Sequence, residues 1–230
     1  MRTLGILGGM SWESTQHLYA LINRGVAARL GGLHSARLLL HSVDFAPIAA
    51  LQAQDGWGEA AALLGAAGAG LQRAGAEALL IATNTMHRVA DDIERAAGLP
   101  VLHIVDATAA ALRAAGVRRA GLLGTRFTMT QGFYAERMAR HGIDIRVPDA
   151  SGQAEVHRLI YEELCRGRFE AASREALRGQ VAALAGQGAE AAILGCTELG
   201  LLLPAGSPAA LPLFDSTDLQ AQAAVDWMLG

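Results

Sequence analysis

Residues 75–86 read GAEALLIATNTM, and residues 188–199 read GAEAAILGCTEL. The two stretches share their first four residues, continue with apolar residues, and bring Thr83 of the first opposite Cys196 of the second. A second matching pair, residues 5–8 and residues 121–124, lies 116 residues apart, close to the 113 residues of the first pair. Two pairs of matching segments, each separated by nearly the same number of residues, indicate that the chain contains two copies of one structural unit.

Short apolar runs alternate with alanine-rich segments of helical periodicity along the chain. The apolar runs are typical of buried parallel strands, and alternation of strands and helices predicts an α/β fold. The predicted strands are residues 3–7, 36–42, 78–82, 101–104, 120–123, 144–147, 191–194 and 211–214. The predicted helices include residues 58–74, 106–115, 133–141, 154–165 and 174–186.

Together, the repeat and the alternation predict two similar Rossmann-like α/β halves with mainly parallel sheets. We expect the first half to comprise residues 1–100 and 210–230, with the last helix crossing back, and the second half residues 101–209. Ligands of such folds bind beyond the carboxyl ends of the strands. Two halves face to face would put Thr83 and Cys196 on opposite walls of one cleft.

The composition excludes several classes of function. Hydrophobic residues make up 52% of the 230 residues and charged residues 18%, which suits a folded protein with a substantial core. The formal charge is −3, so no basic excess favours nucleic-acid binding. All 19 basic residues are arginine, and the missing lysine excludes pyridoxal-phosphate enzymes, Schiff-base aldolases and Walker-type nucleotide binders.

The cysteines and the apolar segments predict a cytoplasmic protein without membrane association. Two cysteines do not make a disulfide scaffold, and no cluster has the spacing of metal ligands. The sequence MRTLGILGGM lacks the features of a signal peptide. Glycines interrupt the apolar stretch at 60–71, which is too short to span a membrane.

Cys196 is the first candidate for chemistry, within the sequence Gly195-Cys196-Thr197-Glu198 that follows a predicted strand. Amide N–H groups and a helix dipole at such a position are expected to lower the pKa of a thiol. The alternative is a buried cysteine that only packs. The repeat favours a functional role for Cys196, whereas packing is the favoured interpretation of Cys165.

The segment Thr83-Asn84-Thr85-Met86-His87 is the second candidate. Adjacent polar groups at the end of a strand suit the binding of a carboxylate. The alternative is an N-cap for a helix that continues through residues 89–96, and both interpretations are compatible. His87 either tunes this site or makes a satisfied structural contact.

The third candidate is Gly8-Gly9-Met10-Ser11, which the pair Gly124-Thr125 mirrors in the second half. Glycines allow a ligand to approach the backbone closely. The spacing differs from the dinucleotide fingerprint. For Gly8 and Gly9 alone, packing in a tight turn is the favoured interpretation.

These motifs resemble, almost end to end, those of the cofactor-independent aspartate/glutamate racemase family. The resemblance implies two α/β halves related by a pseudo-twofold axis, a cleft between them, a homodimer, and racemisation of an amino acid without cofactor or metal. The matching motifs are LGILGGMSWEST at 4–15, SVDF at 42–45, Leu51-Gln52, TNTMH at 83–87, LLGTRFTM at 122–129, IYEELCRG at 160–167, LGCTELGLLL at 194–203 and LFDSTD at 213–218.

The resemblance also implies roles for individual residues. Thr83 and Cys196 would be the pair that transfers protons at the α-carbon. Members with two thiols carry cysteine at both positions, and a hydroxyl is a far poorer base, so we expect one direction of reaction to be slow. Gln220 stands where members often have histidine, which weakens the match there. The implied substrate contacts are Met10, Gln52, Asn84, Thr85, Thr125 and Thr197.

Two other functions remain compatible with these residues. A decarboxylase or cis–trans isomerase of the same superfamily needs only one thiol and therefore fits Thr83. A non-catalytic relative would bind an amino acid without turnover. No single arginine marks the partner of a distal carboxylate, so the substrate stays open among aspartate, glutamate and similar amino acids.

Overall fold

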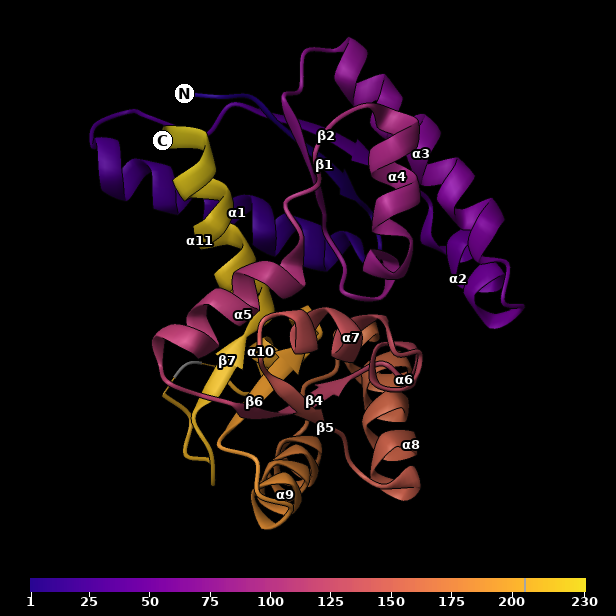
Figure 1. The fold of residues 1–230 in the computed structure, drawn as a ribbon, viewed down its shortest axis with the longest axis vertical. Helices are drawn as coiled ribbons and strands as arrows, with labels where there is room; N and C mark the ends of the chain where they lie inside the picture. Colours follow the sequence, from indigo (N-terminus) through magenta and orange to yellow (C-terminus); the bar gives the residue numbers. More distant parts are fainter. Residues whose placement is uncertain (205) are drawn as a thin grey trace. The chain divides into compact units, whose positions relative to one another are not determined.

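The computed structural model describes residues 1–204 and 206–230. The chain forms two compact units, one of Met1–His103 with Gln220–Gly230 and the other of Ile104–Leu219. Each unit contains one fully parallel sheet flanked by helices (Figure 1). The predicted α/β fold with parallel sheets is confirmed.

The first unit has a three-stranded sheet in the order β2-β1-β3. Leucine and isoleucine side chains fill β1 and β3, which are buried on both faces, as expected for strands between two helical layers. Its elements are β1 (Leu4–Gly8), α1 (Trp12–Leu30), β2 (Leu38–Ser42), α2 (Phe45–Ala53), α3 (Trp57–Arg73), β3 (Ala78–Ile81), the 3₁₀ helix η1 (Thr85–Val89), α4 (Ala90–Ala97) and most of α11 (Ser216–Leu229).

Helices α1 and α11 cover one face of this sheet. Leu4, Ile6 and Leu80 of the strands pack there against Ile22 of α1 and Val225 of α11. Helices α3 and α4 lie on the other face, side by side in Figure 1. The approach is close because small residues line it: a Cβ at Gly68 of α3 would meet Ala97 and Leu79 at 2.9 Å.

The second unit has a four-stranded sheet in the order β5-β4-β6-β7. One continuous apolar core surrounds it, with β4 and β6 at its centre. Its elements are α5 (Ile104–Ala114), β4 (Arg119–Gly124), α6 (Arg126–Thr130), α7 (Phe133–Arg140), β5 (Asp144–Arg146), α8 (Ala150–Arg158), the π-helical turn η2 (Leu159–Glu163), the 3₁₀ turn η3 (Leu164–Arg166), α9 (Ala171–Gly186), β6 (Ala191–Gly195), α10 (Thr197–Leu202) and β7 (Leu213–Asp215).

The strand registers explain the two separations found in the sequence. In the first unit Leu7 of β1 pairs with Ile81 of β3, and in the second unit Leu123 of β4 pairs with Leu194 of β6. Leu7 and Leu123 are 116 residues apart, and Ile81 and Leu194 are 113 apart. The same pair of neighbouring parallel strands therefore occurs in both units.

Several predicted elements are wrong in extent. The predicted strand 101–104 contributes only one bridge, between Val101 and Leu79, and helix α5 begins at Ile104. Three apolar residues and one histidine over four positions fit a buried strand and a buried helical turn equally well, so periodicity could not separate the two. The predicted helix 154–165 begins earlier, at Ala150, where Asp149 caps it, and after Arg158 it becomes the π-helical and 3₁₀ turns.

Gln220, the departure from the family pattern, is buried in the first unit. Its side-chain Nε2 donates to the carbonyl oxygens of Ile81 at 3.4 Å and Leu102 at 3.3 Å. These bonds hold the second turn of α11 against the end of β3 and the segment that precedes α5. A glutamine therefore satisfies two buried carbonyls at this position.

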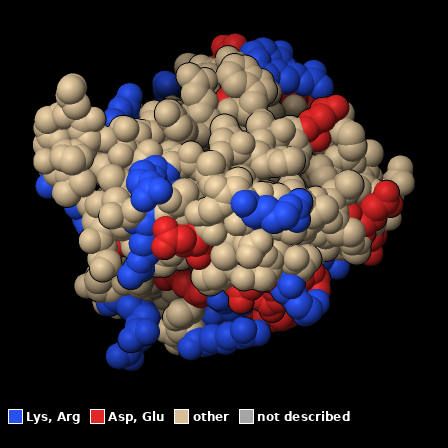
Figure 2. All heavy atoms as spheres, turned by 90° about the horizontal axis from the view of Figure 1, so that it is seen from above, with Lys and Arg blue, Asp and Glu red and all other residues tan. Residues whose placement is uncertain are grey.

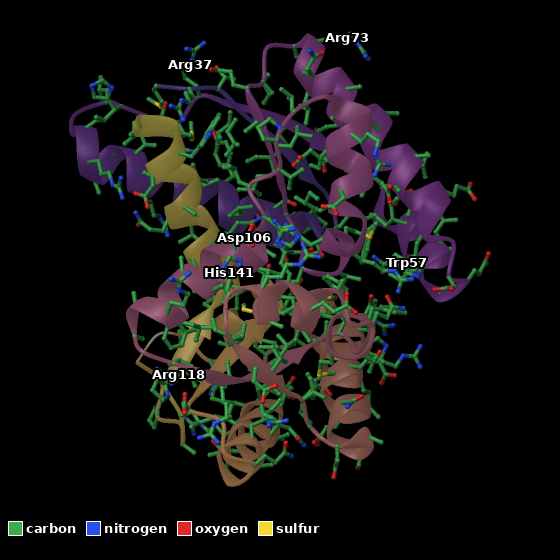
Figure 3. The ribbon with its side chains drawn as sticks, in the orientation of Figure 1. Arg37, Trp57, Arg73, Asp106, Arg118 and His141 are labelled. Atoms are coloured by element: carbon green, nitrogen blue, oxygen red, sulfur yellow. The ribbon has the colours of Figure 1, made fainter. Side chains whose placement is uncertain are left out.

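The surface carries dispersed charge and local ion pairs. Acidic and basic side chains are interspersed on the face drawn in Figure 2. In the second unit, Arg137 of α7 donates two hydrogen bonds to the carboxylate of Asp106 on α5. His141 Nε2 lies 2.8 Å from the same carboxylate, and Figure 3 labels both Asp106 and His141. Within the described residues, no helix is both long enough and apolar enough to cross a membrane.

Candidate functional site

In the first unit, the loop after β1 is built by glycines and one buried threonine. A Cβ at Gly8 would collide with the Thr15 side chain, and one at Gly9 would collide with the Val43 carbonyl oxygen. Gly9 also has φ of +93°, which disfavours other residues. Thr15 Oγ1 accepts from the Gly9 N–H and donates to the Ser11 carbonyl, both at 2.8 Å. The packing interpretation of both glycines is therefore confirmed.

The loop after β3 lies next to the loop after β1, because β1 and β3 are paired neighbours. Asn84 and Thr85 are buried there, and Thr83 is half-buried. His87 Nδ1 lies 2.9 Å from the Thr83 carbonyl oxygen, so this histidine makes the structural contact that was one of its two interpretations. The predicted N-cap is wrong for Asn84, whose side chain makes no capping bond to η1.

Gln52 comes from a separate helix and reaches the same loop. It is only 3% exposed on α2, and its Nε2 donates to the sulfur of Met86 at 3.0 Å. Met10, also buried, follows the glycine pair of the neighbouring loop. The structure thus brings Gln52 to the segment that holds Thr83, Asn84 and Thr85, and this segment neighbours the loop of Met10.

In the second unit, Thr125 and Cys196 begin the two neighbouring loops that follow β4 and β6. Gly124 and Gly195, the residues just before Thr125 and Cys196, are partners in the parallel pairing of β4 with β6. Thr125 and Cys196 therefore follow neighbouring strands at the same register. Thr125 caps α6 by accepting from the Thr128 N–H at 3.3 Å. Thr197, 6% exposed, accepts a hydrogen bond from the Thr217 hydroxyl at 3.1 Å. These two threonines are therefore held in place by neighbouring polar groups.

Cys196 is joined to a buried carboxylate. Its sulfur donates to Glu198 Oε2 at 2.9 Å, and the sulfur of Cys165 donates to Glu198 Oε1 at 3.7 Å. Glu198 is 4% exposed, whereas both cysteines are half-buried. The carboxylate of Glu198 therefore accepts hydrogen bonds from both thiols. The interpretation of Cys165 as a packing residue did not include this hydrogen bond.

The expectation of a lowered Cys196 pKa is wrong. Burial of the sulfur raises the pKa well above its ordinary value, and the negative charge of Glu198 raises it further. Helix α10 has only six residues, and Cys196 makes no side-chain capping bond to it. The increase in the pKa of Cys196 that burial and the Glu198 carboxylate cause is therefore larger than any decrease from the N-terminus of α10.

Tyr161 adds a third group to this cluster. Burial raises the pKa of its phenol, and the charges of Cys196, Cys165 and Glu198 raise it in addition. Its ring packs against His157, with ring centres 4.7 Å apart. Tyr161 therefore stays a neutral hydroxyl beside the thiols over the physiological pH range.

The Glu198→Gln variant should lower the pKa of Cys196. Removing the carboxylate removes a negative charge that opposes formation of the thiolate, so the thiolate should form at lower pH than in the unaltered protein. The measurement is the rate of iodoacetamide alkylation at Cys196 against pH, read for each cysteine by mass spectrometry. Glu175→Gln, at an exposed carboxylate on α9, is the matched control. An unchanged or higher midpoint in Glu198→Gln would contradict this assignment.

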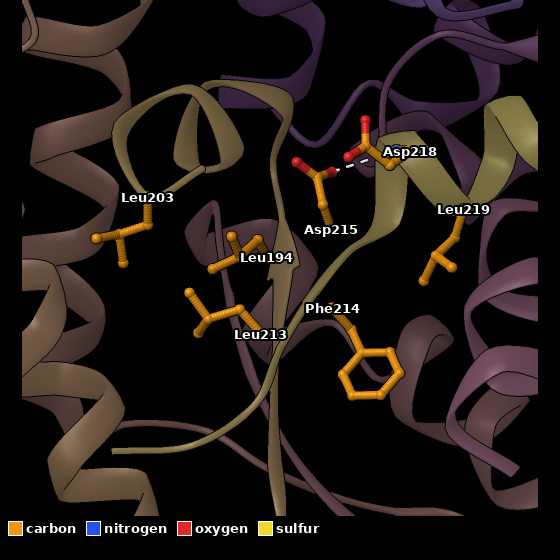
Figure 4. Close-up of a pocket in the computed structure, with 7 residues that line it drawn as sticks. All are labelled: Leu194, Leu203, Leu213, Phe214, Asp215, Asp218 and Leu219. Carbon is orange, nitrogen blue, oxygen red and sulfur yellow. Dashed lines mark hydrogen bonds between the residues drawn. The ribbon is translucent and has the colours of Figure 1, made fainter. Parts of the chain in front are cut away.

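A pocket of about 200 Å³ lies at the end of β6 and β7 in the second unit (Figure 4). Burial, with the charge of Asp218 second, raises the pKa of Asp215 to about 7. Asp215 Oδ1 accepts from the Thr217 and Asp218 N–H groups, and a Cβ at Gly200 would collide with its other oxygen. The lining residues are Leu194, Leu203, Leu213, Phe214, Asp215, Asp218 and Leu219.

Sequence reasoning missed Glu198, Tyr161 and Asp215 as members of the site region. All three lie inside the motifs that carry the family resemblance, and Glu198 stands only two residues after the candidate thiol. The spacing of these three residues in the sequence does not match a known catalytic motif. The contact between Cys165 and Glu198 depends on how the turns after α8 fold. Among the described residues, no group of three metal-binding side chains is close enough to hold a metal ion.

Comparison with known proteins gives a consistent result. Residues 7–224 match the family model described as Asp/Glu/Hydantoin racemase. A Yersinia pestis protein named as a candidate Asp/Glu racemase is 51% identical, with full coverage of both chains and a TM-score of 0.92. An aspartate racemase homologue from Pyrococcus horikoshii is 32% identical, again over both full chains, with a TM-score of 0.84. The Picrophilus torridus aspartate racemase, at 18% identity, covers 99% of this chain and 94% of its own with a TM-score of 0.78, and shows the fold alone.

Proposed function

The chain belongs to the Asp/Glu/hydantoin racemase family, and we propose that it racemises a small polar amino acid of the aspartate or glutamate type without a cofactor. One observation carries the proposal. Thr83 follows Ile81 by two residues and Cys196 follows Leu194 by two residues, so they stand at equivalent positions after equivalent strands of the two units. An acid and a base at equivalent positions of a repeated unit suit the inversion of one carbon.

Cys196 is the base in this proposal. Its thiolate removes the α-proton from one enantiomer, and a proton returns to the opposite face of the carbon from the Thr83 hydroxyl. The Thr83 oxygen regains a proton from water, and the Cys196 thiol then gives its proton back to water, so that the cycle consumes no net proton. The C–H bond breaks toward sulfur, and the new C–H bond forms on the other side. Thr83 is a donor rather than a base because a hydroxyl loses its proton far less readily than a thiol.

The raised pKa of Cys196 supports this role. The α-proton of an amino acid is much less acidic than a thiol, so a thiolate of higher pKa is better matched to it as a base. At neutral pH the free enzyme then holds Cys196 as a thiol, bonded to Glu198. The ammonium group of a bound amino acid offsets part of the Glu198 charge and favours the thiolate when substrate is present.

Neutral donors hold the α-carboxylate in this proposal. Asn84 and Thr85 in the first unit and Thr125 and Thr197 in the second are buried polar residues that follow, in sequence, the same strands as the two proton-transfer residues or their paired neighbours. Hydrogen bonds from such groups stabilise the negative charge that the carboxylate gains as the α-proton leaves. Met10 and Gln52 contribute the remaining contacts to the substrate.

The decisive experiment is a panel of L- and D-amino acids in deuterated water, followed by NMR at the α-position. We expect loss of the α-proton signal with at least one acidic amino acid, and appearance of the opposite enantiomer on a chiral column. No exchange with any member of the panel would overturn the proposal, and calorimetric binding without exchange would identify a non-catalytic amino-acid-binding protein.

Thr83 is the observation that favours a second candidate, a decarboxylase or cis–trans isomerase with Cys196 as its only thiol. Such an enzyme needs no second base. Release of carbon dioxide from a substituted malonate, or conversion of maleate to fumarate, together with absence of α-proton exchange in amino acids, would favour it over the racemase.

We further propose a homodimer located in the cytoplasm. The family resemblance supports the homodimer, and two cysteines outside any disulfide among the described residues are compatible with a reducing compartment.

A further inference from the structure

The carbonyl oxygen of Thr83 accepts a hydrogen bond from a side chain where an α-helix would supply a backbone N–H. In an α-helix the donor would be the N–H four residues later, that of His87. The 3₁₀ helix η1 instead directs this N–H to the Asn84 carbonyl oxygen, at 3.1 Å. The ring of His87 replaces it, with Nδ1 at 2.9 Å from the Thr83 oxygen. Because a carbonyl oxygen only accepts, Nδ1 of His87 carries a proton and donates it.

A second histidine holds the ring of His87 in place. The ring centres of His87 and His103 are 4.6 Å apart, with 60° between the ring planes. His87 is 3% exposed and His103 8%, so close packing limits the movement of both rings. The backbone of Leu102, next to His103, donates to the Leu79 carbonyl at 2.8 Å and accepts from Gln220 at 3.3 Å. His103 therefore stands on a fixed segment and supports His87 from it.

We propose that His87 is a positioning residue that aims the hydroxyl of Thr83. The backbone before Thr83 is fixed by the sheet, because the Ala82 N–H donates to the Leu7 carbonyl at 2.9 Å. The bond from His87 fixes the carbonyl on the other side of Thr83. A threonine has few χ1 rotamers, so the direction of its backbone sets the direction of its hydroxyl. The inference rests on the proposed racemase function, in which this hydroxyl returns the proton.

Loss of the bond from His87 should separate proton exchange from inversion. In deuterated water Cys196 still removes the α-proton of the fast enantiomer and can return a deuteron to the same face, which gives exchange without inversion. Donation from Thr83 to the opposite face depends on the position and direction of its hydroxyl, and a small misplacement slows such a step strongly. A histidine that only stabilised the fold would affect both rates equally.

Histidine variants in deuterated water test the proposal. His87→Leu removes the donor and should lower the ratio of inversion to exchange by at least about 10-fold. His87→Asn should restore most of the ratio, because its amide nitrogen is bonded to Cγ as Nδ1 of the imidazole is and can donate to the same carbonyl. His41→Leu, at an exposed histidine of β2, is the matched control and should leave the ratio unchanged. NMR of the α-position measures exchange, and chiral chromatography measures inversion.

The rotamer of Thr83 provides a second measurement, which needs no activity. Three-bond NMR couplings from its methyl carbon to the backbone nitrogen and carbonyl carbon report χ1. They should indicate one rotamer in the unaltered protein and in His87→Asn, and averaging over rotamers in His87→Leu. Unchanged couplings in His87→Leu would overturn the proposal, and so would an unchanged ratio or equal losses of exchange and inversion. Absence of exchange in the unaltered protein, with the couplings still altered by His87→Leu, would overturn the racemase function alone.

Discussion

The Cys196→Ala variant should exchange the α-proton of its substrate at least about 100-fold more slowly than the unaltered protein, and up to about 10⁴-fold. The methyl group leaves no atom that can take or return a proton, while the neighbouring polar residues stay in place. The fold should tolerate the change because Cys196 is half-buried and its side-chain bond to Glu198 joins two residues only two positions apart, at the start of α10. NMR of the α-position in deuterated water measures the loss directly.

The matched control for this experiment is Cys165→Ala. Cys165 contacts the other oxygen of Glu198 and has similar burial, so its removal perturbs the same cluster without removing the proposed base. Its exchange rate should stay well above that of Cys196→Ala. Equal losses in the two variants would mean that the cluster matters only for structure, and undiminished exchange in Cys196→Ala would exclude Cys196 as the base.

The fold could be predicted from the sequence because the spacing of the sequence repeat equals the spacing between equivalent paired strands of the two units. Each copy contributes a pair of parallel strands buried on both faces, and such strands appear in sequence as uninterrupted apolar runs. Thr83 and Cys196 stood out because each is the first polar residue after its run. A comparison of the two copies therefore identifies equivalent positions from the order of the residues alone.

The surroundings of Cys196 could not be predicted in the same way. The sequence places a thiol at a helix start, which predicts a lowered pKa. It does not reveal that the side chain of Glu198 folds back onto the sulfur. Nor does it show that the helix containing Cys165 loosens into π and 3₁₀ turns. The contact between Cys165 and Glu198, which joins residues 33 apart, depends on packing between two distant segments.

The run at 101–104 shows a different limit. Pro100 and Leu102 each make one backbone bond to Leu79, and the chain then turns directly into α5. Only Val101 of the predicted strand forms a β-bridge, and the last residue of the run, Ile104, is already the first residue of helix α5. The conformation of a short segment between two elements depends on the positions of those elements in the fold. Local periodicity of the sequence carries no information on those positions.

The Thr83→Cys variant should gain activity in the direction that the unaltered protein performs slowly. In the unaltered protein, the enantiomer whose α-proton faces Cys196 should exchange quickly, and the other enantiomer slowly, because the Thr83 hydroxyl is a poor base. A second thiol supplies that base, and general base catalysis typically contributes about 10²- to 10⁴-fold. We therefore expect exchange of the slow enantiomer to rise by about that factor, with the fast enantiomer changed little.

Two further substitutions separate this effect from a change in shape. Thr83→Ser keeps the hydroxyl and should preserve the difference between the enantiomers. Thr83→Val keeps the size of the side chain but removes the donor, so it should slow inversion while leaving exchange of the fast enantiomer in place. Equal exchange rates of the two enantiomers in the unaltered protein would contradict the assignment of Thr83 as a donor only. Loss of exchange in Thr83→Cys for both enantiomers would show that the side chain at this position does not face the α-proton.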